Sequence, residues 1–193
     1  MKKQHRPSGA DTLVRPSKKA DKSVRPTKDT SDQGSVTSNL QTRRRDLPHW
    51  QQGGSVYFVT FRSARGALPP EARRLVIASS LHDHGTKYEF ILGVVMPDHV
   101  HLLLRPMETS PGVWPDLHMI LKSVKGVSAR RINQLMGTTG TVWQDESFDR
   151  IVRDEEEFQE KCNYILNNPI KSSLVNRPED YDFYITPPAA QVE

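Results

Sequence analysis

Two apolar stretches of strand length, separated only by a Pro-Asp pair, constrain the fold of this 193-residue chain more than any other feature. The first stretch, KYEFILGVVM, covers residues 87–96, and the second, HVHLLLR, covers 99–105. Both are rich in β-branched, aromatic and leucine side chains and are therefore predicted to be strands. Because Pro and Asp favour tight turns, Pro97 and Asp98 predict that the two strands are joined directly.

The segments on either side of this pair predict two further strands and three helices. One helical pattern begins at prolines and ends at Gly85, and a second ends at Gly137. The last helix has Asp154 as its N-cap, acids in its first turn, and a predicted end at Pro169. The predicted strands are 55–62, 87–96, 99–105 and 147–152, and the predicted helices are 68–85, 115–137 and 154–169.

The order of these elements, β-α-β-β-α-β followed by one more helix, predicts an α+β fold. It is the ferredoxin-like split β-α-β arrangement, an antiparallel sheet backed by two helices, with an added C-terminal helix that carries Tyr164. The predicted domain covers residues 43–180, and residues 181–193 form a C-terminal extension. Many unrelated activities use this fold, so it does not decide the function.

Residues 1–42 are predicted to be a disordered basic tail. Residues 1–45 contain 12 Lys and Arg against 4 Asp and Glu, whereas the rest of the chain contains 15 against 19. The net charge of +4 therefore comes entirely from the first segment. This segment has too few apolar residues for the burial of their surface to offset the conformational entropy that the segment would lose on ordering. The tail is either a solvated extension or a tether for nucleic acid phosphates.

Composition excludes several classes of protein. The chain has one cysteine, so it forms no internal disulfide and no Cys-rich zinc site. No apolar run approaches the ~18 residues of a membrane span, and the N-terminus lacks the apolar core of a signal peptide. A cytosolic setting without a membrane partner is therefore expected.

Two histidines stand out on the strand 99–105. His99 and His101 alternate with apolar residues, so they point to one face, about 7 Å apart along the strand. Two neutral imidazoles on one face are a candidate metal site, and an incidental surface pair is the alternative. A second pair, His82 and His84, falls at a helix end, where residues two apart do not face each other. That pair is predicted to be surface.

The last helix supplies a candidate nucleophile. Its predicted core stripe consists of Phe158, Cys162, Ile165 and Leu166. Tyr164 lies roughly 145° from the middle of this stripe, at about 100° per residue. It belongs instead to a polar stripe with Glu157, Lys161 and Asn168. Tyr164 is thus free to face a cleft, and a plain exposed tyrosine is the alternative.

Taken together, these residues resemble the HUH single-tyrosine transposases, and within them the REP-associated tyrosine transposases, a domesticated bacterial branch. The resemblance covers about residues 43–180. It is carried by VVMPDHVHLLL, LKSVKGVSARRIN and VWQDESFDRIVRDEEEFQEKCNYILNNPIKSSLV. It implies the same split β-α-β sheet. It also implies that His99 and His101 bind a divalent metal, that Tyr164 is the nucleophile, and that Asn168 completes the metal site.

The resemblance further implies an activity. A metal ion, Mg²⁺ or Mn²⁺, assists the nicking and rejoining of single-stranded DNA at hairpin or palindromic repeats through a covalent 5′-phosphotyrosine. The protein would be a bacterial cytoplasmic, nucleoid-associated monomer or homodimer, with Tyr164 acting in its own chain or in a partner. The alternative is a domesticated protein that holds hairpin DNA without cutting it.

The helix 115–137 is a candidate DNA-contacting element, because it is basic on a domain that is otherwise acidic. Its candidate residues are Lys122, Lys125, Arg130 and Arg131. A solvated helix face is the alternative. Trp143 either stacks on a base or packs in the interior, and packing is expected.

Overall fold

The computed structural model describes residues 40–43 and 49–187. Almost all of the predicted tail lies outside these ranges, so the tail stays a prediction. None of the helices in the described ranges is long and apolar enough to cross a bilayer. The elements are β1 (Leu40–Arg43), β2 (His49–Gln52), β3 (Tyr57–Ser63), α1 (Pro70–Leu81), β4 (Tyr88–Val95), β5 (His99–Pro106), α2 (Leu117–Met136), β6 (Trp143–Ile151), α3 (Glu155–Lys171), the short 3₁₀ helix η1 (Pro178–Asp180) and β7 (Tyr184–Ile185).

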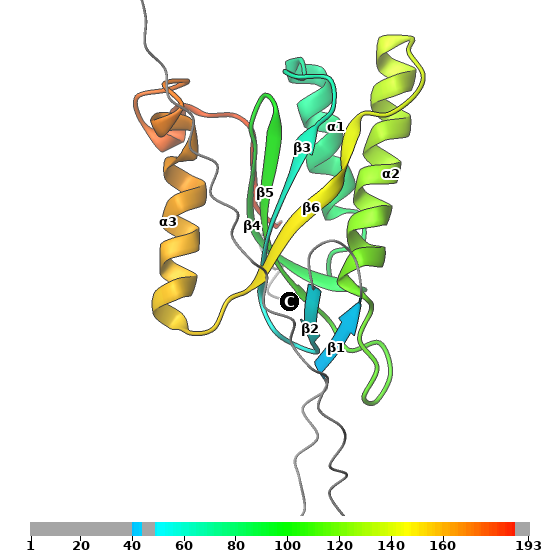
Figure 1. Cartoon of the computed structure of the whole chain (residues 1–193). Coiled ribbons are helices and arrows are strands. Elements are labelled where there is room, and N and C mark those ends of the chain that lie inside the picture. Colours follow the sequence, from blue (N-terminus) through cyan, green and yellow to red (C-terminus); the bar gives the residue numbers. More distant parts are fainter. Residues whose placement is uncertain (1–39, 44–48, 188–193) are drawn as a thin grey trace, which may run out of the picture. The chain divides into compact units, whose positions relative to one another are not determined.

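Five of these strands form one antiparallel sheet in the order β6-β3-β5-β4-β7 (Figure 1). The first four strands in this order come from the β-α-β-β-α-β segment, so the predicted ferredoxin-like α+β fold is confirmed. β1 and β2 form a separate two-stranded sheet that the sequence pattern did not predict. β7 adds a further strand outside β4.

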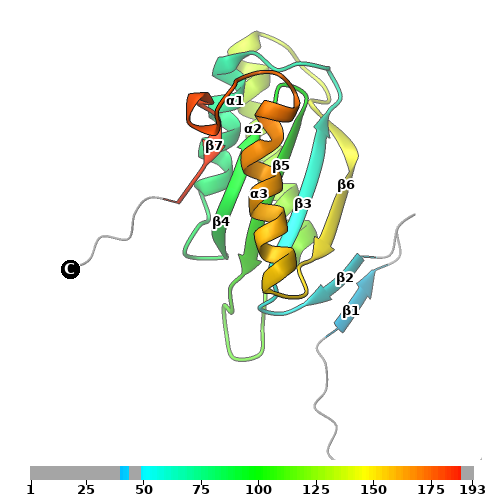
Figure 2. The same cartoon turned by 90° about the vertical axis from the view of Figure 1, so that its left-hand side faces the viewer.

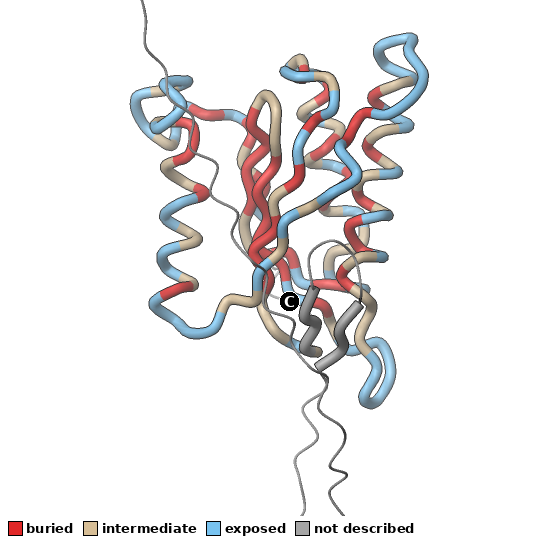
Figure 3. The backbone as a smooth tube through the Cα atoms, in the orientation of Figure 1, coloured by how far each residue is buried: buried red, intermediate tan, exposed pale blue. Residues whose placement is uncertain are grey.

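The helices lie on both faces of the five-stranded sheet. Figures 1 and 2 show α1 and α2 on one face and α3 on the other. Figure 3 shows the buried backbone, in red, concentrated in the central strands. Trp143 joins β6 to α2, because its ring packs edge-on against Phe61 at 4.9 Å and its Nε1 donates to Ser128 Oγ at 3.0 Å. The expectation that Trp143 packs in the interior is confirmed.

Side-chain capping explains where α2 and α3 begin. The side chain of Asp116 accepts from the backbone N–H of His118 at the start of α2. Asp154 accepts in the same way from Glu157 at 2.8 Å at the start of α3, as predicted. α2 ends at Met136 and is capped by Gly137, whose φ of 61° is left-handed, a conformation that glycine adopts without strain.

The predicted end of α3 at Pro169 is wrong. Pro169 is buried inside the helix, which continues to Lys171 and is capped at Ser172 by a bond from its N–H to the carbonyl of Asn168 at 3.0 Å. A proline lacks only one helical donor, and packing of the last turn against the domain outweighs that loss. Asn168 consequently keeps its helical position.

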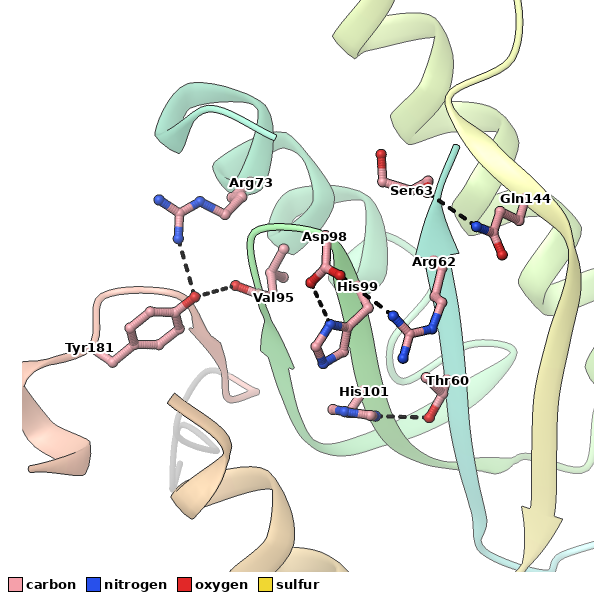
Figure 4. Close-up of polar contacts among 10 residues, drawn as sticks. All are labelled: Thr60, Arg62, Ser63, Arg73, Val95, Asp98, His99, His101, Gln144 and Tyr181. Carbon is pink, nitrogen blue, oxygen red and sulfur yellow. Dashed lines mark hydrogen bonds and ion pairs between the residues drawn. The ribbon is translucent and has the colours of Figure 1, made fainter. Parts of the chain in front are cut away.

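The chain returns to the sheet after α3. Tyr181, Phe183 and Ile185 are buried, and β7 pairs with β4. The hydroxyl of Tyr181 donates to the carbonyl of Val95 at 2.7 Å and lies 3.1 Å from a guanidinium nitrogen of Arg73 (Figure 4). The expectation that the domain ends at residue 180 therefore misses residues 181–185, which pack into the core. A two-residue strand has no alternation for a sequence pattern to detect.

Candidate active site

His99 and His101 lie side by side on β5, on the face of the sheet that carries α3. Their ring centroids are 4.7 Å apart with an interplanar angle of 74°. The alternation of side chains along a strand places both rings on one face, as the sequence predicts. The two imidazoles are therefore close enough to present nitrogen atoms to one ion.

His101 is the more deeply buried of the two, with 4% of its surface exposed. Its Nδ1 lies 2.8 Å from the hydroxyl oxygen of Thr60, whereas its Nε2 is buried without a hydrogen-bond partner among the described residues (Figure 4). Burial, and then the nearby charges of His99 and Arg62, lower the pKa of His101 to about 3. The ring is therefore neutral near pH 7. When Nδ1–H donates to Thr60, Nε2 presents a lone pair.

His99 is held by a carboxylate instead of a hydroxyl. Its Nδ1 lies 2.7 Å from Asp98 Oδ1, and Asp98 Oδ2 accepts from Arg62 Nη1 at 3.4 Å (Figure 4). Burial raises the pKa of Asp98, but the hydrogen bond with His99 and the charges of His99 and Arg62 outweigh burial and leave the pKa below its usual value. A carboxylate on one ring nitrogen fixes the orientation of the ring and leaves the other nitrogen for a ligand.

Three of these supporting residues were missed by sequence reasoning. Asp98 was interpreted only as a turn residue. Thr60 and Arg62 belong to β3, and they reach the histidines because the register pairs Thr60 with His101 and Arg62 with His99. No local pattern in the sequence reveals that register.

Tyr164 meets the histidines from α3. Its ring centroid is 5.1 Å from that of His101 and 5.8 Å from that of Phe58, both in edge-on geometry, and 38% of its surface is exposed. Phe58 in turn stacks on His101 at 5.4 Å with an interplanar angle of 19°. The structure thus brings Tyr164, His101 and His99 into one cluster, while Tyr164 stays accessible.

The face of α3 that packs on the sheet includes residues of both predicted stripes, and Phe158 and Cys162 of the apolar stripe pack against the core. Glu157 and Asn168 are buried, whereas Phe158, Cys162 and Leu166 are only partly buried. Only Ile165 of the predicted core stripe is fully buried. The sheet beneath α3 carries the two histidines, so it accommodates the polar side chains of Glu157 and Asn168 beside the apolar ones.

The buried end of this polar face is anchored by charge pairs. Glu157 Oε1 lies 2.8 Å from Arg150 Nε of β6, and Glu157 Oε2 accepts from the Nε of Arg153 at 2.9 Å. The hydrogen bond from Arg153 is the main reason that the pKa of Glu157 lies below its usual value. The first turn of α3 is thereby tied to the sheet.

Asn168 lies one helical turn beyond Tyr164, and only 7% of its surface is exposed. The described ranges contain no cluster of three or more His, Cys, Asp or Glu side chains that could hold a metal ion. A metal at this site would therefore depend on two imidazoles, the Asn168 amide and outside ligands. The unpartnered Nε2 of His101 fits such a role, and the mixed nitrogen and oxygen donors suit a divalent ion.

The four basic residues predicted to contact DNA are not brought to this cluster. They belong to α2, which lies on the opposite face of the sheet (Figure 2). Lys122, Arg130 and Arg131 lie along the helix, and all three are exposed. Lys125 bonds to β6, because its Nζ donates to the carbonyls of Gln144 and Asp145 at 2.8 and 3.0 Å and lies 3.1 Å from Ser147 Oγ.

Comparison with known proteins adds the following findings. A family model described as "Transposase IS200 like" matches residues 72–168, a range that includes both histidines and the tyrosine of the cluster. The structure of a REP-associated tyrosine transposase bound to a REP hairpin is 20% identical and has a TM-score of 0.58, with 73% of this chain and 82% of that chain covered. A putative transposase from Deinococcus radiodurans R1 is 20% identical with a TM-score of 0.41, covering 66% and 97%. No curated protein matches the chain.

Proposed function

The chain belongs to the family of IS200-like transposases, and we propose that it nicks single-stranded DNA in a metal-dependent reaction and rejoins it through Tyr164. One observation carries this proposal. Tyr164 packs against His101 with the ring centroids 5.1 Å apart, and His101 keeps a buried Nε2 without a partner in the described structure. A protein that only holds DNA has no use for this combination.

We assign the metal site to His99, His101 and Asn168. A bound Mg²⁺ or Mn²⁺ would polarise a phosphodiester oxygen and offset the charge that develops at phosphorus. Burial keeps His101 neutral, which is the protonation state that a ligand requires. Thr60 and Asp98 hold the other ring nitrogens and so keep both rings oriented.

Tyr164 supplies the nucleophile. Its phenol oxygen attacks phosphorus in line, a P–O bond to tyrosine forms, and the P–O bond to the 3′ oxygen breaks. The phenol proton is released, and the 3′ oxygen takes up a proton to leave as a 3′-OH. The 5′ phosphate stays on the tyrosine, so the bond energy is conserved and rejoining needs no nucleotide cofactor.

The contact between Tyr164 and His101 occurs within one chain, which supports action of Tyr164 at the site of its own chain. We propose a hairpin with a single-stranded flank as the substrate. The support for the hairpin is the shared fold with a transposase that was solved bound to one.

The test is the formation of a covalent adduct. The full chain is incubated with single-stranded hairpin DNA and Mn²⁺, and a denaturing gel is examined for protein shifted by attached DNA. Tyr164→Phe keeps the ring but removes the attacking oxygen, so it should bind the hairpin and form no adduct at any Mn²⁺ concentration. His101→Ala should also form none at low Mn²⁺, with partial recovery at high Mn²⁺.

Tyr184→Phe is the matched control. The hydroxyl of Tyr184 donates to the carbonyl of Leu166 at 2.5 Å, and burial raises the pKa of this tyrosine. Removal of the Tyr184 hydroxyl should leave adduct formation unchanged. An adduct formed by Tyr164→Phe would refute the assigned nucleophile. A wild-type protein that binds hairpins but forms no adduct would favour the non-cleaving DNA-binding protein.

A further inference from the structure

Phe148 of β6 is a large apolar side chain that the fold leaves 53% exposed. The register pairs Phe148 with Thr60 of β3, and Thr60 with His101 of β5. Directly paired residues on antiparallel strands point to the same face. The 2.8 Å contact between Thr60 and His101 fixes which face this is. The exposed ring therefore lies on the face of the candidate active site, two strands or about 10 Å from His101.

α3 does not cover this part of the sheet. In Figure 2, with α3 in front, β3 and β6 emerge to the side of the helix, and β6 is the last strand of the sheet. α3 lies instead over the central strands, where Tyr164 packs on His101. On this part of the sheet Phe148 and Arg62 are exposed and Thr60 is partly buried, whereas Phe58 and His101, which contact Tyr164, are buried.

Two arginines and one carboxylate lie near Phe148 on this face of the sheet, the carboxylate being that of the exposed Glu146, which precedes Phe148 by two residues. Arg150 follows Phe148 by two residues and pairs with Phe58, and Arg62 pairs with His99, so both arginines share the face. Arg62 and Arg150 are exposed. Arg62 contacts Asp98 through Nη1, and Arg150 contacts Glu157 through Nε. A guanidinium carries five N–H donors, so each arginine retains donors for a second anion.

We propose that Phe148, Arg62 and Arg150 form a stacking platform for unpaired nucleotides next to the cleaved phosphate. One base stacks on the Phe148 ring, and the two arginines donate to flanking phosphates. An accessible aromatic ring between cationic groups is the arrangement by which proteins bind single strands, and every base offers a π face to it. A base inside a duplex has no free face, so the platform takes the flank of a hairpin and not its stem.

This inference rests on the proposed function, and its test measures binding separately from cleavage. The full chain is titrated, with chelator present, into two fluorescent hairpins, one blunt and one with an unpaired flank of about ten thymines. Phe148→Ala should weaken binding to the flanked hairpin by roughly tenfold and leave the blunt hairpin unchanged. Phe148→Trp should retain binding, because indole stacks at least as well.

Met119→Ala is the matched control, because Met119 is equally exposed at 53% but lies on α2, on the other face of the sheet. It should leave both affinities unchanged. A 2-aminopurine placed in the flank should be quenched by the wild-type protein and not by Phe148→Ala, which separates stacking from a general loss of affinity.

If Phe148→Ala binds the flanked hairpin and quenches 2-aminopurine as strongly as the wild type does, the platform is refuted. Adduct formation by the wild type would still support the proposed nicking activity in that case. Conversely, if Phe148→Ala weakens binding to the flanked hairpin but the wild type forms no covalent adduct, the platform is supported and the proposed cleavage is refuted. If Phe148→Ala instead turns a dimer into a monomer without altering flank binding, the face is a protein interface and the platform is refuted.

Discussion

The two imidazoles of the candidate site differ in what holds them. His99 faces the carboxylate of Asp98 at 2.7 Å, whereas His101 faces the neutral hydroxyl of Thr60 at 2.8 Å. A carboxylate adds negative charge and makes the opposite ring nitrogen a stronger donor, while a hydroxyl only orients the ring. We therefore expect both residues to contribute to metal affinity, Asp98 through its charge and Thr60 by holding the ring of His101 in the orientation that binds.

Thr60→Val should weaken Mn²⁺ binding by about 10- to 100-fold, which is the usual effect of losing a hydrogen bond behind a metal ligand. Valine keeps the shape of threonine but leaves Nδ1–H of His101 without an acceptor, so the ring is free to turn. Thr60→Ser restores the hydroxyl and should stay close to wild type. Calorimetric titration with Mn²⁺ in the absence of DNA measures both. Equal affinities for the two variants would remove Thr60 from the metal site.

His101 should make the metal-free protein less stable in mild acid. Its pKa is about 3 in the folded protein, against the ordinary histidine value of 6.5, so the unfolded chain binds more protons between these values. The free energy of unfolding therefore falls as the pH drops below about 6.5, by about 2 kcal/mol between pH 7 and pH 5. Above about pH 6.5 the contribution is fully retained.

Urea unfolding with chelator at the two pH values measures this loss. His101→Leu has no group to titrate, so its loss of stability over the same interval should be smaller by about 2 kcal/mol. The difference between the two proteins isolates His101 from the other titrating groups. Identical pH dependence would mean that His101 is hydrated and titrates normally.

At the scale of the elements, one lysine of α2 bonds this helix to strand β6, although the basic composition of α2 suggests only contacts with DNA. Lys125 reaches across to β6 and bonds to two carbonyl oxygens and one hydroxyl oxygen there. A lysine ammonium has three donors, and these contacts use all of them. Lys125 therefore connects the helix to the strand, whereas Lys122 on the same helix is exposed.

Lys125→Ala should lower the free energy of unfolding by about 1–2 kcal/mol, because it leaves the two carbonyls of β6 without this donor. Lys122→Ala should change the stability by no more than about 0.5 kcal/mol, as for other surface substitutions. Urea unfolding compares the two. DNA affinity at several salt concentrations then tests the predicted DNA contacts, since loss of a phosphate contact at Lys122 should make the salt dependence shallower. Unchanged affinity and salt dependence would place Lys122 outside the DNA surface.

The whole molecule divides into residues 1–36 and 37–193. The first unit contains nine Lys and Arg against four Asp and Glu. Its removal should leave cooperative unfolding intact, because the described core is built from later residues. DNA binding by the shortened chain should depend less steeply on salt, by about 0.7 for each contact to a single-strand phosphate that is lost.

Fluorescence anisotropy at several salt concentrations measures this slope. A full-length variant with the nine basic residues of the segment changed to Gln separates charge from length. It should behave as the shortened chain does if charge is the cause. A slope that is unaltered in both proteins would identify the segment as a solvated extension. Loss of cooperative unfolding in the shortened chain would make it part of the core.

The sequence by itself determined those features that depend on neighbours along the chain. Alternation in β5 placed His99 and His101 on one face, and the cap at Asp154 marked the start of α3. The order of strands and helices along the chain was sufficient to predict the ferredoxin-like fold. The physical reason is that side-chain periodicity and capping involve only a few consecutive residues.

Only the tertiary structure decided which side chains meet from different elements. Thr60 reaches His101 through strand register, and a slip of one residue would turn Thr60 to the other face. Glu157 and Asn168 of α3 are buried together with Ile165, because the sheet beneath the helix carries the polar histidines, although the helix alone favours its apolar stripe. Pro169 stays helical and Lys125 bonds to β6 for the same reason, because packing between distant segments outweighs the preferences that each segment has alone.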